Sequence, residues 1–328
     1  MNLIAALETG LRAAVGPTAA TYALLAIGLN VHYGFTGLLN FGQVGFMLVG
    51  AYGVGITVVV LGWSLWIGIV IGVLASVALA VVLGAPTLRL RADYFAITTI
   101  ALAEVLRLMS NSAVSTPLTG GPFGLQSVAS EFYAVNPLPA GLTLGPFNYS
   151  PNVTWTLLVG WTLAALMCVV VLVLMKSPWG RVLRSIREDE DAARALGKNV
   201  FSYKMQSLIL GGVMGGLGGV MYTLAGSTVN PNSFRPQITF YAYAMLIIGG
   251  IASKFGPMIG AVIFWFLLQS MSAVVRQASS ADLLPEWLSG SAAVGGSAFV
   301  LTGVLLMVLV VFRPQGLFGN KREIRLDA

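Results

Sequence analysis

The chain has 328 residues, of which 57% are hydrophobic and only 9% are charged. A water-facing surface needs about 25% charged residues, so this composition excludes a soluble globular protein and predicts a surface that faces lipid. The net charge of +6 does not indicate nucleic-acid binding, because the basic residues lie in short connections between apolar stretches, where they set membrane topology.

The apolar stretches are long and unbroken, which favours helices over a β-barrel, whose strands would alternate with period two. We therefore expect an all-α fold, a polytopic transmembrane helix bundle formed by one domain over residues 1–328. Residues 1–16 have no apolar core with a cleavage site, so we expect no signal peptide there. The stretches able to cross, or nearly cross, about 30 Å of hydrocarbon are 18–33, 44–61, 64–84, 94–112, 153–175, 205–226, 238–253, 256–276 and 294–312.

Two regions depart from the pattern of an ordinary helix. Residues 33–42 hold three glycines in ten residues, and the stretch at 238–253 is short for a full span. Both are expected to be broken or re-entrant, a geometry that occurs at membrane depth only where protein covers it or where it lines a cavity. The expected number of spans is therefore eight to ten.

Gly37, Asn40 and Gly42 in the first broken region are candidate residues of a translocation pathway. The backbone amides and carbonyls of a broken helix can bind a polar solute weakly and without fixed charge. The alternative, that the glycines only allow close packing, stays open. His32, the only histidine, cannot form a metal site alone, and we expect a hydrogen-bonded packing role for it.

Ionisable residues within spans are a default functional hypothesis. Glu104 and Arg107 lie three residues apart on one helix face, so they can pair with each other. That pairing favours a structural role over a proton relay.

Residues 114–152 contain no lysine or arginine and carry six prolines and five glycines. This composition predicts an irregular external loop. Thr119, Gly120 and Gly121 are candidates for the outer mouth of the pathway or for contact with a delivering protein. A plain turn is the favoured alternative.

Residues 176–204 hold seven lysines and arginines, and the tail at 313–328 holds four more. The positive-inside rule places both in the cytoplasm, and nine crossings would then leave the N-terminus outside. Ser177 followed by Pro178 indicates a helix start, with serine as the cap.

Four adjacent acids at residues 188–191 repel each other, so we expect a helix break there. Asp189 would cap a second, short helix, and Arg194 would lie towards its negative end. Gly197 would end that helix in the left-handed conformation. Further along, Gly211, Gly215 and Gly219 recur every four residues and predict a groove for close helix packing.

The order Asp191-Ala192-Ala193, three residues, Gly197 resembles the Glu-Ala-Ala element that binding-protein-dependent ABC permeases present to their ATPase subunits. It differs in having Asp191 where the family element has glutamate, and in lacking the family's Ile-x-Leu-Pro tail. Further segments are similar to the branched-chain amino-acid ABC permease family, and specifically to its M-type subunit. These segments lie in order at residues 33–42, 118–124, 177–181, 249–251, 255–261 and 313–319.

This resemblance implies the ABC importer permease fold, in a multi-pass protein of a bacterial-type cytoplasmic membrane. The chain would form half of the translocation pathway for branched-chain or related amino acids. Its partners would be a second, similar permease, two cytoplasmic ATPases that bind ATP and magnesium, and an extracytoplasmic binding protein. The residues expected to contact an ATPase, as a coupling helix, are Arg187, Glu188, Asp189, Glu190, Asp191, Ala192, Ala193, Arg194 and Gly197.

The sequence contains no phosphate-binding Gly-x-x-x-x-Gly-Lys-Ser/Thr loop, no Cys/His cluster and no nucleophile elbow. We therefore expect no catalytic residue, metal site or cofactor, and no enzyme activity. Two alternative functions stay open. Relatives of the same family carry urea or short amides, and an ion-coupled secondary transporter or channel would need an unpaired carboxylate within a span.

Overall fold

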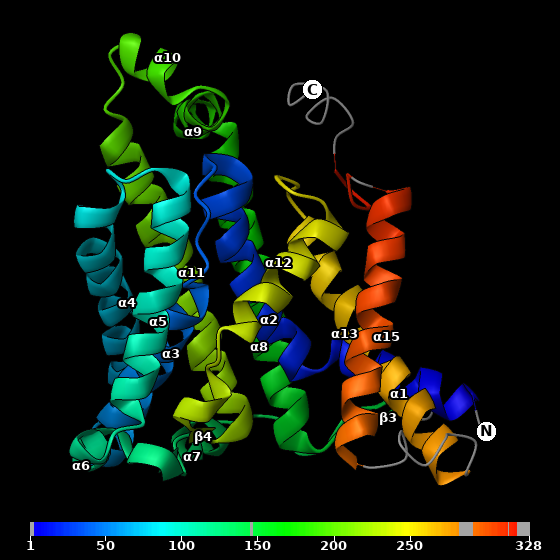
Figure 1. The fold of residues 1–328 in the computed structure, drawn as a ribbon. Coiled ribbons are helices and arrows are strands. Elements are labelled where there is room, and N and C mark those ends of the chain that lie inside the picture. Colours follow the sequence, from blue (N-terminus) through cyan, green and yellow to red (C-terminus); the bar gives the residue numbers. More distant parts are fainter. Residues whose placement is uncertain (1–2, 145–146, 282–290, 314, 320–328) are drawn as a thin grey trace.

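The computed structural model describes residues 3–144, 147–281, 291–313 and 315–319. Its helices run between two ends of the molecule (Figure 1). Helices α9 (Pro178–Glu188) and α10 (Glu190–Ala195) lie at one end, together with the last turn of α15. Helix α1 (Leu3–Val15) lies at the opposite end.

All nine apolar stretches predicted from the sequence are helical. They form α2 (Pro17–Leu29), α3 (Gln43–Gly55), α4 (Leu65–Thr87), α5 (Ala92–Ser110), α8 (Pro151–Lys176), α11 (Val200–Gly226), α12 (Gln237–Gly249), α13 (Gly256–Ser280) and α15 (Ser291–Phe312). Two π-helical segments, η1 (Asn30–Phe35) and η2 (Ile56–Val60), extend α2 and α3.

Length and hydropathy identify five of the described helices as spans: α3 with η2, α4, α8, α11 and α13. A sixth span results if α1 and α2, which meet at a 50° bend, cross as one unit. These criteria count fewer than the eight to ten spans expected, partly because α2 and α12 have only 13 residues each.

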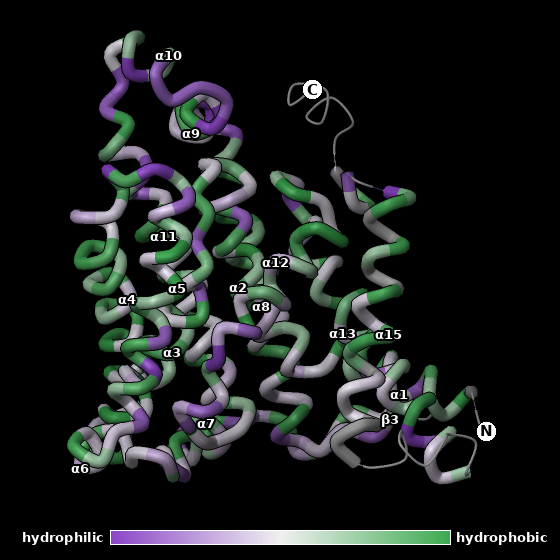
Figure 2. Tube along the Cα trace, in the orientation of Figure 1, coloured by the Kyte–Doolittle hydropathy of each residue, from purple (hydrophilic) through white to green (hydrophobic). Residues whose placement is uncertain are grey.

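The outward faces of the long helices are apolar. On α4, Val70, Leu74 and Val82 are exposed, and α8 exposes Leu166 and Val173 in the same way. Figure 2 shows the hydrophilic residues concentrated over α9 and α10, whereas the shafts of the helices are mostly hydrophobic. The surface thus matches lipid along the bundle and water at its end.

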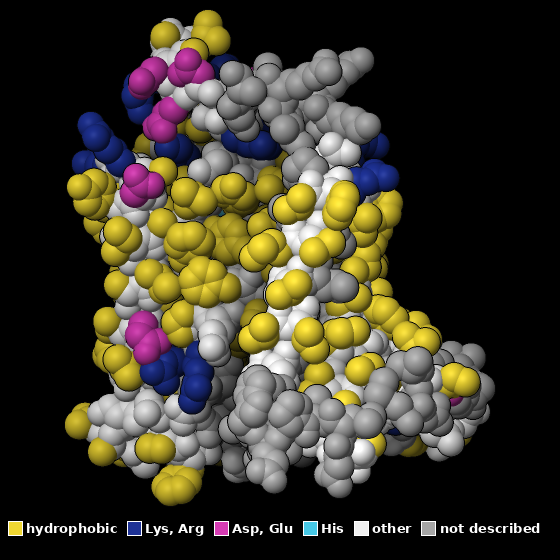
Figure 3. Space-filling view, turned by 45° about the vertical axis from the view of Figure 1, so that its right-hand side comes forward, with side chains coloured by type: hydrophobic (Ala, Val, Ile, Leu, Met, Phe, Trp, Pro, Cys, Tyr) yellow, Lys and Arg dark blue, Asp and Glu magenta, His cyan; other side chains and the backbone are white. Residues whose placement is uncertain are grey.

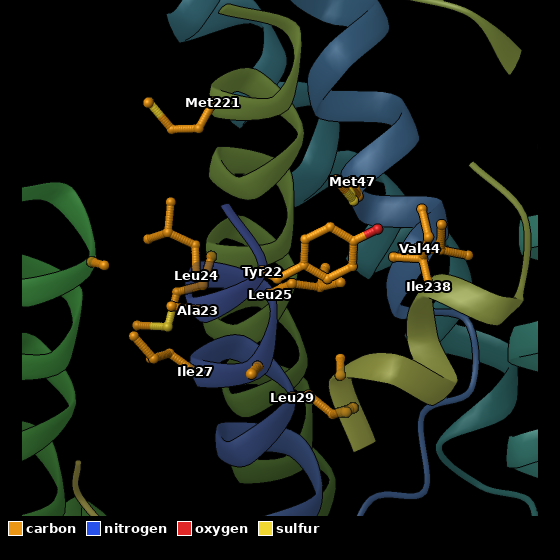
Figure 4. Close-up of a cluster of buried hydrophobic side chains, with 14 of the residues drawn as sticks. Tyr22, Ala23, Leu24, Leu25, Ile27, Leu29, Val44, Met47, Met221 and Ile238 are labelled. Atoms are coloured by element: carbon orange, nitrogen blue, oxygen red, sulfur yellow. The ribbon is translucent and has the colours of Figure 1, made fainter. Parts of the chain in front are cut away.

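Helix α11 lies at the centre of the bundle, against α2, α3 and α4. Figure 4 shows part of this core, where the ring of Tyr22 on α2 lies close to Met47 on α3. The predicted glycine groove is confirmed. A Cβ at Gly211 would overlap the carbonyl oxygen of Gly28, and one at Gly219 would overlap that of Met47. The glycines therefore allow backbone-to-backbone packing within the subunit.

The segment that was expected to be an irregular external loop is more ordered than predicted. It contains η3 (Ala113–Ser115), α6 (Thr116–Thr119), η4 (Gly121–Phe123), β1 (Leu125–Gln126), α7 (Ser130–Ala134), β2 (Thr143–Leu144) and β3 (Phe147–Asn148). Strand β1 pairs antiparallel with β4 (Thr228–Val229), which precedes η5 (Pro231–Ser233), and β2 pairs with β3. The loop also fixes α4, because Glu131 accepts a hydrogen bond from the Leu65 amide at 2.7 Å.

Only part of the predicted C-terminal tail lies within the described residues. The amides of Leu317 and Phe318 donate to the carbonyls of Ile248 and Gly249, at 2.9 and 3.1 Å. These bonds satisfy carbonyl groups that the end of α12 would otherwise leave unpaired.

Candidate functional site

The predicted break at residues 33–42 is confirmed. The helix formed by α2 and η1 ends at Phe35, residues 37–40 are not helical, and α3 begins at Gln43. Gly37 has φ of +76°, a left-handed conformation that favours glycine. The chain thus leaves one helix and starts another inside the bundle.

Buried side chains hydrogen-bond across this break. Asn40 is fully buried, and its Nδ2 donates to Nδ1 of His32 and to Oε1 of Gln43, both at 3.0 Å. Its Oδ1 accepts from the amide of Gly42 at 2.9 Å. Gln43 in turn donates to the carbonyl of Gly211 on α11 at 3.0 Å. The broken segment is therefore fixed to the glycine face of α11.

These contacts determine the tautomer of His32. Nε2 lies 3.1 Å from the carbonyl oxygen of Leu208, which can only accept, so Nε2 carries the proton. Nδ1 is then free to accept from Asn40. The expected packing role of His32 fits this geometry, since the ring is completely buried and both nitrogens are hydrogen-bonded.

The second broken region meets the first. Helix α12 is short, as expected, and begins well above the lower end of the bundle (Figure 1). Thr239 accepts a hydrogen bond from the amide of Val44 at 3.0 Å, and the Tyr243 hydroxyl donates to the carbonyl of Asn40 at 3.2 Å. The Phe41 ring lies 5.6 Å from that of Phe240, centre to centre. The first turns of α3 and α12 thus form one aromatic and polar unit at the middle of the bundle.

Of the three pathway candidates, Asn40 and Gly42 lie at this unit, and Gly37 lies apart from it, against α9. Asn40 and Gly42 are buried, and Gly37 is half-buried against Arg187. A Cβ at Gly42 would overlap the carbonyl oxygen of Thr99. Each of these residues therefore has a structural role in the break, while their contact with a transported solute stays a prediction. The neighbouring side chain that reaches the surface is Phe240, which is 48% exposed.

The short helix predicted after the acidic run is confirmed as α10. Asp189 breaks the preceding helix and caps the next one, with its Oδ1 accepting from the amides of Asp191 and Ala192 at 2.9 Å each. Gly197 ends the element with φ of +77°. Ser177 was expected to cap α9, but its hydroxyl instead donates to the carbonyl of Leu174.

Helix α10 is held firmly on one side and exposed on the other. Glu190 pairs with Arg194 at 2.9 Å and also with Lys204 of α11, while Asp191 pairs with Arg194 at 2.7 Å. Ala193 is buried against Ile186 and Val200.

The outer side of α10 and its C-terminal turn present a small surface. Among the residues expected to contact an ATPase, Glu188, Asp189, Asp191, Ala192, Arg194 and Gly197 are exposed. Leu196 is 78% exposed beside them, although the sequence interpretation did not include it. A leucine directly before the terminating glycine was the signal that could have identified it.

Arg187 points into the membrane domain. Its Nη1 donates to the carbonyl of Gly34 in η1 at 2.6 Å, and a Cβ at Gly37 would lie 3.4 Å from its Cγ. Asn30, one turn before Gly34, accepts from the amide of Ala252 and donates to the carbonyl of Ser253, at 3.0 and 2.8 Å. Arg187 thus connects the segment before α10 with the end of the first broken helix.

Thr119, Gly120 and Gly121 form a tight turn at the end of α6. The Thr119 hydroxyl donates to the carbonyl of Ser110 at 2.7 Å, and Gly120 has φ of +73°. A Cβ at Gly120 would overlap the carbonyl oxygen of Gly124. This geometry gives the turn a structural reason, and a contact with a delivering protein stays a prediction.

Comparison with known proteins identifies related sequences. Residues 14–312 match the family described as branched-chain amino acid transport system, permease component. The chain is 29% identical over 312 residues to the high-affinity branched-chain amino acid transport system permease protein LivM of Salmonella typhimurium, covering 92% of this chain and 68% of the relative. A probable LivM of Methanocaldococcus jannaschii is 26% identical, with 92% and 91% covered.

More distant relatives have other names. The nucleoside ABC transporter permease protein NupC of Lactococcus lactis is 28% identical over 265 residues, which cover 76% of this chain and 78% of the relative. Among solved structures, PsaBC from Streptococcus pneumoniae in complex with Fab aligns over 99% of both chains, with a TM-score of 0.44 and 15% identity.

Proposed function

We propose, because the chain belongs to the branched-chain amino acid transport system permease family, that it forms half of the pathway by which an ATP-driven importer carries branched-chain amino acids. The protein is a multi-pass membrane permease subunit of an ABC importer. The partners in this proposal are a second, similar permease, two ATPases on the side of α10, and a binding protein at the opposite end. In this proposal the ATPases bind ATP and magnesium, and the tail after α15 lies in the cytoplasm.

The observation that carries the proposal is the connection from α10 to the broken helix. The exposed surface of α10 is small enough to enter a cleft of an ATPase, and its base is fixed by Ala193 and the Glu190–Lys204 pair. A displacement of α10 would reach Arg187, which is bonded to η1. Movement of η1 would shift residues 37–42, which follow it directly. ATPase closure is thereby coupled to the centre of the bundle.

The substrate class follows from the relatives and from the polarity of the site. Branched-chain amino acids are named for the LivM relatives, whereas NupC is named for nucleosides. At the break, the polar groups are amides, hydroxyls and one neutral histidine, together with the rings of Phe41 and Phe240. Such groups bind a zwitterion with an apolar side chain weakly, so that it can leave again.

Uptake by the reconstituted importer tests this function. The chain, its partner permease and the ATPases would be placed in liposomes with the ATPases and ATP facing the lumen, and the binding protein would be added outside. We expect ATP-dependent uptake of leucine, isoleucine and valine, and no uptake of guanosine or urea. Guanosine or urea uptake without leucine uptake would contradict the substrate class. Uptake by this chain alone, driven by an ion gradient, would contradict the importer.

Replacing Arg187 with alanine is expected to separate ATP hydrolysis from transport. The ATPases should still bind, because the exposed surface of α10 is unchanged, but uptake per ATP should fall about tenfold. The reason is the loss of a charge-assisted hydrogen bond, worth about 1.5–3 kcal/mol, between Arg187 and Gly34. The ratio of leucine uptake to phosphate release measures the effect.

The matched control for this experiment is Arg181→Ala, which removes an exposed arginine from the same helix. It should leave the ratio unchanged. An equal loss in both variants would mean that positive charge on α9, rather than the link to η1, matters for coupling.

A further inference from the structure

A group of polar and charged side chains lies where α5 approaches the segment that precedes α12. Arg107 of α5 donates to Oδ1 of Asn232 at 3.4 Å, which joins α5 to η5. Arg235 follows three residues later and lies close enough for its charge to act on the Glu104 carboxylate. Figure 3 shows acidic and basic side chains gathered low on one face, beneath an area of hydrophobic side chains.

The charges in this group do not cancel. Glu104 is engaged by Arg107 through two contacts, Nε to Oε2 at 2.9 Å and Nη2 to Oε1 at 2.6 Å, so these two residues neutralise each other. Arg235 is exposed, and no hydrogen bond or ion pair of its side chain occurs among the described residues. One positive charge is therefore left over.

An unpaired charged side chain between membrane helices is energetically unfavourable, so its presence suggests a function. Arg235 lies two residues before α12, whose first turn contacts the broken segment through Thr239. Arg235 belongs to the segment between η5 and α12, which the Arg107–Asn232 hydrogen bond joins to α5. Ionisable groups in such places mark solute pathways by default.

The first turn of α12, which follows Arg235, carries an exposed aromatic side chain. Phe240 follows Arg235 by five residues, is 48% exposed, and packs its ring against Phe41 of the broken segment. The region therefore offers an acid–base pair, a free guanidinium and an apolar surface. An amino acid with a branched apolar side chain presents the complementary groups, an ammonium, a carboxylate and a hydrocarbon.

We propose that Arg235 and the side-chain amide of Asn232 form an outward-facing subsite that binds the α-carboxylate of the transported amino acid. Phe240 contacts the side chain of that amino acid. This inference rests on the proposed function. The subsite is shallow, and an exposed ion pair binds weakly, which suits a residue that must release its ligand towards the centre of the bundle. It acts on the solute between its delivery and its passage through the broken helices.

The test compares leucine uptake by complete importers that carry Arg235→Gln, Arg235→Lys or Arg276→Gln. Arg276 is exposed towards the end of α13 and is the matched control. We expect Arg235→Gln to lower leucine uptake about five- to tenfold. Arg235→Lys should restore most of it, and Arg276→Gln should have no effect. Stimulation of ATP hydrolysis by the unloaded binding protein should stay unchanged in all three variants.

Several results would overturn the subsite. These are unchanged uptake in Arg235→Gln, an equal loss in Arg276→Gln, or a loss of uptake that appears only in vesicles containing phosphatidylglycerol, which would assign Arg235 to a lipid headgroup. A wild-type importer that carries no amino acid at all would instead refute the proposed function. The two failures are therefore distinguishable.

Discussion

Replacing Leu196 with glutamate is expected to prevent the ATPases from co-purifying with the permease and to lower ATP-dependent leucine uptake about a hundredfold. Leu196 is 78% exposed at the C-terminal end of α10, directly before the glycine that ends the element. In an ATPase cleft this side chain would be buried, and a buried, unpaired carboxylate is strongly unfavourable. The measurement is the amount of ATPase retained by the tagged permease after purification.

The permease itself should be unharmed by Leu196→Glu, because the side chain has no packing partner to lose. Leu118→Glu, at a 54% exposed leucine of α6, is the matched control and should retain the ATPases. Normal ATPase retention in Leu196→Glu would contradict the assignment of α10 as the docking helix. Ala193 would be a poorer position for this test, because it lies on the buried side of α10, against Ile186 and Val200.

Gly219→Ala is expected to destabilise the membrane domain by about 3 kcal/mol. The added Cβ would overlap the carbonyl oxygen of Met47 and approach the amide of Ala51, so α11 and α3 would have to separate. Backbone atoms cannot move aside as a flexible side chain does, and packed interiors relax only partially. The thermal midpoint of the purified permease in detergent, followed by circular dichroism, measures the loss.

Gly218→Ala is the control on the adjacent residue. There the nearest atom to the new Cβ is the carbonyl oxygen of Thr21 at 3.3 Å, so a shift of a few tenths of an ångström is enough. Alanine is also a better helix former than glycine by about 1 kcal/mol, and we expect little change in the midpoint. Equal losses in both variants would show that helix flexibility, rather than the close approach of α11 and α3, decides stability.

Local chemistry explains why much of the segment around α10 could be predicted from the sequence. Asp189 caps α10 and Gly197 ends it, because both effects depend on residues within one helical turn. The Glu104–Arg107 pair was predicted for the same reason, since residues three apart share a helix face. The break within residues 33–42 could be predicted from the three glycines of that segment.

Predictions that depended on distant partners were less complete. Arg187 was grouped with the ATPase contacts, yet its guanidinium bonds to Gly34, which is 153 residues away in the chain. Asn40 was chosen for a pathway because it lies in a broken segment, and the structure adds three buried hydrogen bonds to it. Arg235 becomes a candidate only through its exposure and its position near α5, which no local pattern encodes.

The sequence by itself determined that the chain is a helical membrane protein, where its helices lie and where two of them are interrupted, because hydrophobic length, caps and glycines act over a few residues. Only the tertiary structure decided that α3 and α12 start against each other and that α11 fills the space between α2, α3 and α4. It also decided that an arginine of α9 reaches a broken helix. Such contacts arise from packing between segments that share no local signal, so they appear only once the whole chain is folded.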